Sequence, residues 1–255
     1  MKRIVDLPNG ILYIEPTYEG MSNQAANILC TKVRAYPEGA YGFATGSTPI
    51  GLYKELVKRF KAGEIDFSKI TTFNLDEYYP IEKSNPQSYN YFMRENLFNH
   101  INVQSENIFL PNGEINDPAL ECAEFERKLR EAKICLQILG LGLNGHIGFN
   151  EPDEVFSKET SLVNLTESTI EANARFFDSI DEVPREAISM GIGSIMSARN
   201  ILLLVNGSAK AETLYEALYG KINPWMPASA LQFHQNLTVV TDAAAAEVII
   251  KKLNL

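Results

Sequence analysis

Short runs of apolar residues, long enough for a buried strand, alternate along the chain with segments whose apolar residues recur at helical spacing. The apolar runs predict strands over residues 40–44, 71–75, 134–139, 200–205 and 237–241. The helical spacing predicts helices over residues 20–33, 88–100, 118–132 and 209–219, another through Leu52, Tyr53, Leu56 and Val57, and an alanine-rich one at the C-terminus. We assign no element to the opening segment. Strands that alternate with helices are typical of a parallel sheet covered by helices.

The pattern therefore predicts an α/β fold of Rossmann-like type, in which helices flank an open, mostly parallel sheet. We expect a single domain over residues 1–255, because the composition hardly shifts along the chain and neither a low-complexity linker nor a fixed-period repeat interrupts it. A length of 255 residues also suits one large α/β domain. The strand order does not follow from these patterns.

The composition is that of a folded globular protein, with 45% hydrophobic and 22% charged residues. Lys and Arg total 23 against 32 Asp and Glu, which leaves a net charge of −9. Nucleic acids and anionic membranes bind cationic surfaces, so we expect neither as a partner. A small anionic ligand would need positive charge concentrated at its own site.

The three cysteines, Cys30, Cys122 and Cys135, are an odd number without Cys-x-x-Cys spacing, so neither a disulfide framework nor a zinc ribbon is expected. The N-terminus lacks the pattern of a signal peptide, and no apolar stretch approaches the length of a membrane span. We therefore expect a cytoplasmic protein. Its oligomeric state is left open, with a homo-oligomer among the alternatives.

In an open α/β sheet, ligands bind beyond the carboxyl ends of the strands. The turn after the strand at 40–44 contains Gly46, Ser47 and Thr48, followed by Pro49. Pro49 suits the first helical position and Thr48 the N-cap before it. Glycine lets a backbone approach a ligand closely, and a helix N-terminus favours an anion such as phosphate. A capped helix start without any ligand explains this turn equally well.

An acidic pair, Asp76 and Glu77, follows the strand at 71–75. A carboxylate at this end of a strand can act as a general base. Alternation along the chain directs the two side chains to opposite sides, so we expect one of them to face a site, and periodicity does not say which. A solvated loop carboxylate is the alternative.

The glycine-rich loop after the strand at 134–139 contains Asn144, His146 and Glu151. Histidine takes and returns a proton near neutral pH, and a carboxylate such as Glu151 can orient the ring and support its charged form. A metal site is not expected, because no second His or Cys lies at a ligand spacing. A structural histidine is the alternative.

Two cations complete the set of candidates. Lys210 lies in the first turn of a helix, where a cation opposes the helix dipole and is better explained by a phosphate ligand. Arg175 has a planar guanidinium that suits the same ligand, although a surface arginine explains it as well.

Taken in order, these motifs resemble those of the glucosamine-6-phosphate deaminases, also called glucosamine-6-phosphate isomerases. The resemblance covers nearly the whole chain and rests on T-G-S-T-P, F-N-L-D-E-Y-Y, N-G-H-I-G-F-N-E-P, A-R-F-F-D and N-G-S-A-K. It implies the conversion of glucosamine 6-phosphate and water to fructose 6-phosphate and ammonia, in amino-sugar catabolism, without a redox cofactor or a catalytic metal.

The resemblance also implies a role for each matched residue. His146, supported by Glu151, would move the proton that opens the pyranose ring, and Asp76 would shuttle a proton between C2 and C1 through a cis-enolamine. The phosphate would be held by Gly46, Ser47, Thr48, Arg175 and Lys210.

Two features depart from the family pattern. Many members have Asp where this chain has Asn144, and an amide carries no charge that stabilises an imidazolium ring; other members have Asn, so activity is still expected. Members activated by N-acetylglucosamine 6-phosphate have cations where this chain has Ser161 and Val163. The resemblance therefore implies no such activation.

Two other functions compete with this interpretation. A 6-phosphogluconolactonase would bind a similar phosphosugar on a similar fold, but its glycine-histidine motif has different neighbours. A non-catalytic sugar-phosphate sensor would need no proton carriers, whereas this chain has Asp76, His146 and Glu151. The sequence favours the deaminase; it indicates neither the direction of flux nor selectivity against galactosamine 6-phosphate.

Overall fold

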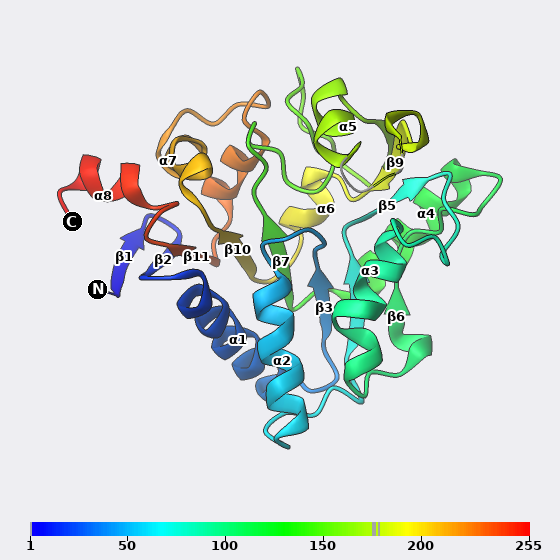
Figure 1. Ribbon diagram of the computed structural model, residues 1–255, viewed down its shortest axis with the longest axis horizontal. Helices are drawn as coiled ribbons and strands as arrows, with labels where there is room; N and C mark the ends of the chain where they lie inside the picture. Colours follow the sequence, from blue (N-terminus) through cyan, green and yellow to red (C-terminus); the bar gives the residue numbers. More distant parts are fainter. Residues whose placement is uncertain (1, 175–176, 178) are drawn as a thin grey trace.

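The computed structural model describes residues 2–174, 177 and 179–255, and an eight-stranded sheet forms its centre (Figure 1). The strand order is β1-β2-β11-β10-β7-β3-β4-β6, and all neighbours run parallel except β1 and β2. The predicted open, mostly parallel sheet is therefore confirmed. Its strands are β1 (Arg3–Leu7), β2 (Gly10–Glu15), β3 (Ala40–Phe43), β4 (Thr71–Asn74), β6 (Ile108–Phe109), β7 (Leu136–Gly140), β10 (Ile201–Val205) and β11 (Leu237–Asp242).

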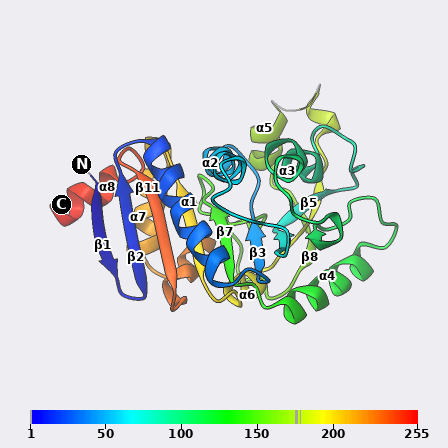
Figure 2. The same cartoon turned by 90° about the horizontal axis from the view of Figure 1, so that it is seen from below.

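Helices cover both faces of this sheet (Figure 2). One face carries α1 (Tyr18–Ala35), α2 (Ile50–Lys61) and α3 (Tyr89–Asn96). The other carries α4 (Pro118–Ala132), α6 (Ile192–Met196) and α7 (Ala211–Tyr219), and α8 (Glu247–Leu253) packs beside α7. Because parallel strands are joined by right-handed crossovers, the direction in which the chain moves across the sheet decides which face each helix covers.

That direction reverses between β3 and β7, which lie side by side. From β3 the chain continues to β4 on one side, whereas from β7 it continues through the smaller sheet to β10 on the other side. In open α/β sheets, ligands bind outside the carboxyl ends of the strands at such a reversal. The topology therefore indicates the turns after β3 and β7 as the place for a ligand.

A second, antiparallel sheet of three strands was not predicted. It consists of β5 (Asp76–Tyr79), β9 (Glu186–Ser189) and β8 (Ser161–Asn164), with α5 (Glu167–Ala174) nearby (Figure 1). Leu75 is the corner between the two sheets, and its carbonyl accepts a hydrogen bond from the Met190 N–H at 2.8 Å. Each of these strands has only four residues, too few for a clear apolar period.

Several predicted boundaries change. The helix predicted over 118–132 is α4, but the one over 88–100 consists of α3 and a 3-10 turn, Phe98–His100. The one over 209–219 starts as the 3-10 turn Ser208–Lys210 before α7. The alanine-rich C-terminal stretch is turn until α8 begins, and the opening segment is the β1–β2 hairpin.

Among the residues that the structure describes, two clusters of buried apolar side chains hold the fold together. The larger joins the eight-stranded sheet to its helices, and the smaller lies at the three-stranded sheet and consists of Tyr78, Ile81, Phe149, Leu165, Ile170, Val183 and Ala187. The glycine-rich loop after β7 contributes to both, because Ile147 is in the larger cluster and Phe149 in the smaller. Burial of these two side chains fixes the loop between the sheets.

Within the part of the chain that the structure describes, every helix is too short or too polar to span a membrane.

Candidate active site

The turn after β3 contacts the turn after β10. Thr48 is buried, and its Oγ1 donates a hydrogen bond to Asn206 Oδ1 at 2.7 Å. Gly46 and Ser47 are exposed, and Gly46 has a φ of +97°, a conformation that favours glycine. The turn thus presents backbone and a serine hydroxyl to solvent, while Thr48 connects it to the neighbouring turn.

The prediction that Thr48 caps α2 is wrong. The residue at the N-cap is Pro49, without a side-chain capping bond, and the helix begins at Ile50. The Thr48 hydroxyl is directed to Asn206 instead, and the Gly51 N–H in the first turn of α2 donates to the Tyr18 hydroxyl at 2.7 Å. A tertiary contact therefore replaces the local cap.

Lys210 lies at the end of the turn after β10, directly before α7. Gly207 in this turn has a φ of +86°, and its N–H donates to both carboxylate oxygens of Asp242 at 3.1 Å. Burial lowers the pKa of the Lys210 ammonium, and no acidic side chain among the described residues offsets this effect. A partly buried cation without an acidic partner beside a helix start is suited to a phosphate.

The two carboxylates of the acidic pair diverge. Glu77 faces the N-terminus of α3, where it accepts hydrogen bonds from the N–H groups of Tyr89 and Asn90, both at 2.8 Å. Burial raises the pKa of Glu77 to about 7, and these hydrogen bonds oppose that shift. Glu77 therefore supports the start of a helix, a structural role.

Asp76 faces the glycine-rich loop after β7. It pairs with Ser189 in the antiparallel register of β5 and β9, and a Cβ atom on Gly148 would lie 3.4 Å from Asp76 Oδ2 and 3.3 Å from Ser189 Oγ. Burial, and then the negative charge of Glu77, raise the pKa of Asp76 to about 8; the residue is only 5% exposed. A carboxylate whose pKa lies this high is a competent general base near neutral pH.

His146 and Asn144 are joined in the same loop. His146 Nδ1 lies 2.7 Å from Asn144 Oδ1, and Asn144 Nδ2 donates to Glu151 Oε2 at 2.6 Å. The carboxylate accepts, so the amide must present its NH₂ group to Glu151 and its oxygen to the ring. His146 Nδ1 therefore carries the hydrogen, which leaves Nε2 as the basic nitrogen.

The Glu151 carboxylate accepts hydrogen bonds from several side chains. Burial opposes its ionisation, but hydrogen bonds and charge from His146, and hydrogen bonds from Thr169 and Asn144, lower the pKa of Glu151 to about 2. His146 Nδ1 lies 3.5 Å from Glu151 Oε1, the oxygen that also accepts from the Thr169 hydroxyl. The site thus contains one carboxylate that stays ionised and another, Asp76, that titrates near neutral pH.

The His146 ring lies against the backbone of Gly142. A Cβ atom on Gly142 would come within 2.4–2.5 Å of Nδ1, Cε1 and Nε2 of the imidazole. Such distances are far below van der Waals contact, so only glycine leaves room for the ring at this position.

The structure brings together most of the residues that we selected from the sequence. Gly46, Ser47 and Thr48 meet the turn that carries Lys210, and Asp76 meets the loop that carries Asn144, His146 and Glu151. Arg175 lies outside the described residues. In the part that the structure does describe, no group of three or more His, Cys, Asp or Glu side chains is placed to hold a metal ion.

Two residues in contact with the site were not selected. Asn206 is in the N-G-S-A-K motif, directly after a strand, and that position alone was a usable signal. Thr169 lies in α5, 18 residues beyond Glu151, and no local pattern connects the two.

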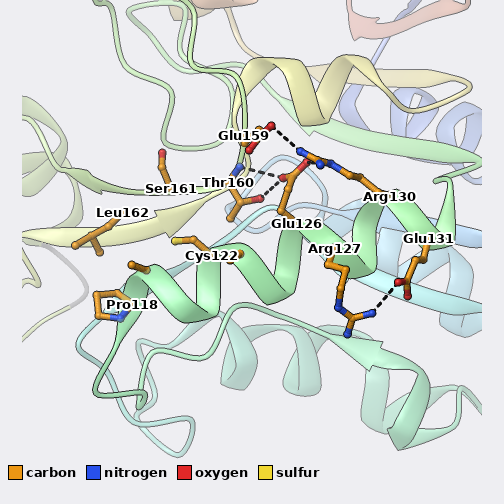
Figure 3. Close-up of a pocket in the computed structure, with 12 residues that line it drawn as sticks. Pro118, Cys122, Glu126, Arg127, Arg130, Glu131, Glu159, Thr160, Ser161 and Leu162 are labelled. Atoms are coloured by element: carbon orange, nitrogen blue, oxygen red, sulfur yellow. Dashed lines mark hydrogen bonds and ion pairs between the residues drawn. The ribbon is translucent and has the colours of Figure 1, made fainter.

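A groove lies beside α4 (Figure 3). It has a volume of about 730 Å³ and is lined by α4 and residues 159–162. Arg127 pairs with Glu131 at 2.7 Å and Arg130 with Glu159 at 2.6 Å, so acidic neighbours neutralise its two arginines. None of the described site residues lines this groove.

Comparison with known proteins decides the family. A model of the family described as glucosamine-6-phosphate isomerases/6-phosphogluconolactonase matches residues 18–240. A glucosamine-6-phosphate deaminase of Clostridium botulinum (strain Loch Maree / Type A3) is 52% identical over 96% of this chain and 99% of its own length. One of Alkaliphilus oremlandii (strain OhILAs) is 52% identical over 94% of this chain and 100% of its own. This chain belongs to the glucosamine-6-phosphate deaminase family.

Solved structures agree with this family. A monomeric glucosamine-6-phosphate deaminase superposes with a TM-score of 0.90 at 41% identity, covering 93% of this chain and 99% of that one. A 6-phosphogluconolactonase from Thermotoga maritima gives a TM-score of 0.74 at 18% identity, over 91% of this chain and 99% of its own. The lactonase shares the fold alone. The deaminase resemblance expected from the sequence motifs is thereby confirmed.

Proposed function

We propose that this chain converts glucosamine 6-phosphate and water to fructose 6-phosphate and ammonia by general acid–base catalysis in the turns after β3, β4, β7 and β10. The observation that carries the proposal is 52% identity to glucosamine-6-phosphate deaminases over nearly the whole chain. The lactonase alternative has no comparable support, because its similarity stays at 18%.

The phosphate is held where two turns meet. Gly46 and Ser47 offer backbone and hydroxyl groups, Thr48 connects the two turns, and Lys210 supplies a positive charge. Arg175 adds a second cation by its match to the family motif. A fixed phosphate places the carbon atoms of the sugar at set distances from the proton carriers.

Ring opening uses His146. Its Nε2 takes the proton of the C1 hydroxyl while the C1–O5 bond breaks, and the ring oxygen O5 receives a proton in return. The C1 oxygen becomes the aldehyde carbonyl of the open chain. Asn144 and Glu151 hold the imidazole in the tautomer that this step requires.

Isomerisation uses Asp76. Its ionised carboxylate takes the C2 proton, the electron pair forms the C1–C2 double bond, and the C1 oxygen gains a proton to give a cis-enolamine. Protonation at C1 moves the double bond to C2 and nitrogen. Water then adds to C2, and the C–N bond breaks to release ammonia and leave the ketone of fructose 6-phosphate.

The test is to offer the purified protein glucosamine 6-phosphate without added metal and to measure ammonia and fructose 6-phosphate together. We expect equal amounts of the two products, and no loss of activity with a chelator. An Asp76→Asn variant keeps the shape of the side chain but removes the base, so turnover should fall by about 100-fold or more while phosphosugar binding is retained. Near-normal turnover in Asp76→Asn would remove this residue from the mechanism.

The partner of this enzyme is a dissolved phosphosugar. The acidic composition and the unpaired cysteines support a cytoplasmic location without nucleic acid or membrane as a partner. Binding of labelled nucleic acid or anionic vesicles at physiological salt would contradict this part of the proposal.

A further inference from the structure

We propose that Thr169 of α5 is a positioning residue that holds the carboxylate of Glu151 in place, so that α5 takes part in the proton relay at His146. This inference rests on the proposed function of His146 and Glu151. Thr169 itself touches neither the imidazole nor any atom of the sugar in the mechanism above. Its hydroxyl donates a hydrogen bond to Glu151 Oε1, and its side chain is buried.

The two oxygens of Glu151 are held by different donors. Oε2 accepts from Asn144 Nδ2 at 2.6 Å, whereas Oε1 accepts from Thr169 and lies 3.5 Å from His146 Nδ1. The terminal torsion of a glutamate is soft, so a carboxylate needs a donor at each oxygen to keep one orientation. Without Thr169, the long contact to His146 would be the remaining restraint on Oε1.

Thr169 is itself fixed in position. Its hydroxyl lies 3.1 Å from the hydroxyl of Thr166, and its backbone N–H donates to the Thr166 carbonyl at 3.0 Å. The next residue, Ile170, is 1% exposed and belongs to the smaller apolar cluster. The position of α5 on that cluster therefore decides where the Thr169 hydroxyl lies.

Loss of the Thr169–Glu151 hydrogen bond would affect the His146 imidazole through Asn144. Glu151 sets the orientation of the Asn144 amide, and the amide oxygen sets the tautomer of His146. A carboxylate that rotates away from Asn144 allows the amide to turn and to present its NH₂ group to the ring. Thr169 thus acts at a distance on the nitrogen that carries the proton.

The experiment compares two variants of Thr169 with one control. Thr169→Val keeps the shape of the side chain and removes the donor, and Thr169→Ser keeps the donor. Thr213→Val is the matched control, because the Thr213 hydroxyl donates to the Leu143 carbonyl of the same loop at 2.7 Å without contacting Glu151. Thermal melts of all three establish that each variant is folded.

We expect Thr169→Val to lower kcat by about 10- to 100-fold with KM within about twofold, because a lost hydrogen bond to a charged group has an effect of this size and Thr169 contacts no atom of the sugar in the proposed mechanism. Thr169→Ser should recover most of the activity, and Thr213→Val should keep it. Unchanged kcat in Thr169→Val, or an equal defect in Thr169→Ser, would overturn the proposal.

A second measurement does not depend on turnover. Carbon-13 NMR of the Glu151 carboxyl, assigned with Glu151→Gln, should show protonation at higher pH in Thr169→Val than in wild type, and no such change in Thr213→Val. An identical titration in wild type and Thr169→Val overturns the positioning role even if the protein is an active deaminase. If the wild-type protein releases no ammonia but the Glu151 titration shifts as expected in Thr169→Val, the proposed function is refuted and the Thr169 contact is still established.

Discussion

Gly142 is the residue whose replacement gives the sharpest test of the imidazole position. A Cβ atom there would lie 2.4 Å from His146 Nδ1, so Gly142→Ala must displace either the ring or the loop. We expect kcat/KM to fall by about 100-fold or more, which is the usual contribution of a positioned proton carrier. Steady-state kinetics with glucosamine 6-phosphate measures the loss.

Gly140→Ala is the control for this prediction. Gly140 is two residues earlier in the same segment, and a Cβ atom there would meet no atom within 4 Å. Its activity should stay within about threefold of wild type, since crowding of the His146 ring at position 142, and not the loss of a glycine as such, displaces the ring. Equal defects in the two variants would contradict the steric explanation.

The interpretation of Asn144 changes once its hydrogen-bond partners are known. From the sequence, the amide is a weaker partner of His146 than an aspartate, because it carries no charge. In the structure it donates to Glu151 and accepts from His146 at the same time. A carboxylate cannot donate to Glu151 unless it is protonated, so the amide connects the two groups in a way that an ionised Asp does not.

At the scale of elements, the turns that precede α2 and α7 are in contact through Thr48 and Asn206, and we propose that together they bind the phosphate. Lys210→Ala removes its described cation, and we expect KM to rise by about 10- to 100-fold with a smaller change in kcat, because a charge-assisted hydrogen bond is worth about 1.5–3 kcal/mol. Steady-state kinetics separates the two constants.

Lys54→Ala is the control for Lys210→Ala. Lys54 is exposed on α2 and belongs to neither turn, so its removal changes the net charge by the same amount without altering either turn's own residues. We expect KM to stay within about twofold of wild type. A similar rise in both variants would mean that overall charge, and not the turn, attracts the phosphosugar.

The three-stranded sheet determines where the side chains of Asp76 and Glu77 point. β5 continues from β4 through the corner at Leu75, and its pairing with β9 directs Asp76 to the glycine-rich loop and Glu77 to α3. The split between the two side chains follows from alternation along a strand. Which of them faces the site depends on the partners on each side, and these come from distant segments.

At the scale of the whole molecule, the buried carboxylates make stability depend on pH. The folded-state pKa values of Asp76 and Glu77, about 8 and about 7, lie above the ordinary value of about 4. Between pH 4 and 8 the folded protein therefore holds protons that the unfolded chain has released. The free energy of unfolding should fall as pH rises through this window and level off above it.

Asp76→Asn removes one of these two groups, so its free energy of unfolding should fall less between pH 5 and pH 8.5 than that of wild type. Urea unfolding at the two pH values measures the difference. Glu151 does not interfere, because its pKa of about 2 places its own effect below pH 5, where stability is lost as pH falls. Parallel pH dependence in Asp76→Asn and wild type would show that the burial of Asp76 does not raise its pKa.

Local sequence patterns predicted much of the fold and part of the candidate site. The apolar runs located the central strands, and the residues just after them included Asp76, His146 and Lys210, because strand ends at a reversal of an α/β sheet converge in space. The same patterns missed the β1–β2 hairpin and the four-residue strands of the smaller sheet, where too few residues alternate to give a period.

By itself the amino-acid sequence determined the α/β class, the helices and long strands, and the family. Both the periodicity of apolar residues and the short motifs involve residues that are close together in the chain, so they can be read without the structure. Tertiary structure alone decided that Thr48 bonds to Asn206 and not to its own helix, that Asp76 and not Glu77 faces the loop, and that Thr169 reaches Glu151. These choices depend on atoms brought together from segments 18 to 158 residues apart. No local period encodes such contacts, because the free energy of each depends on the packing of both sheets.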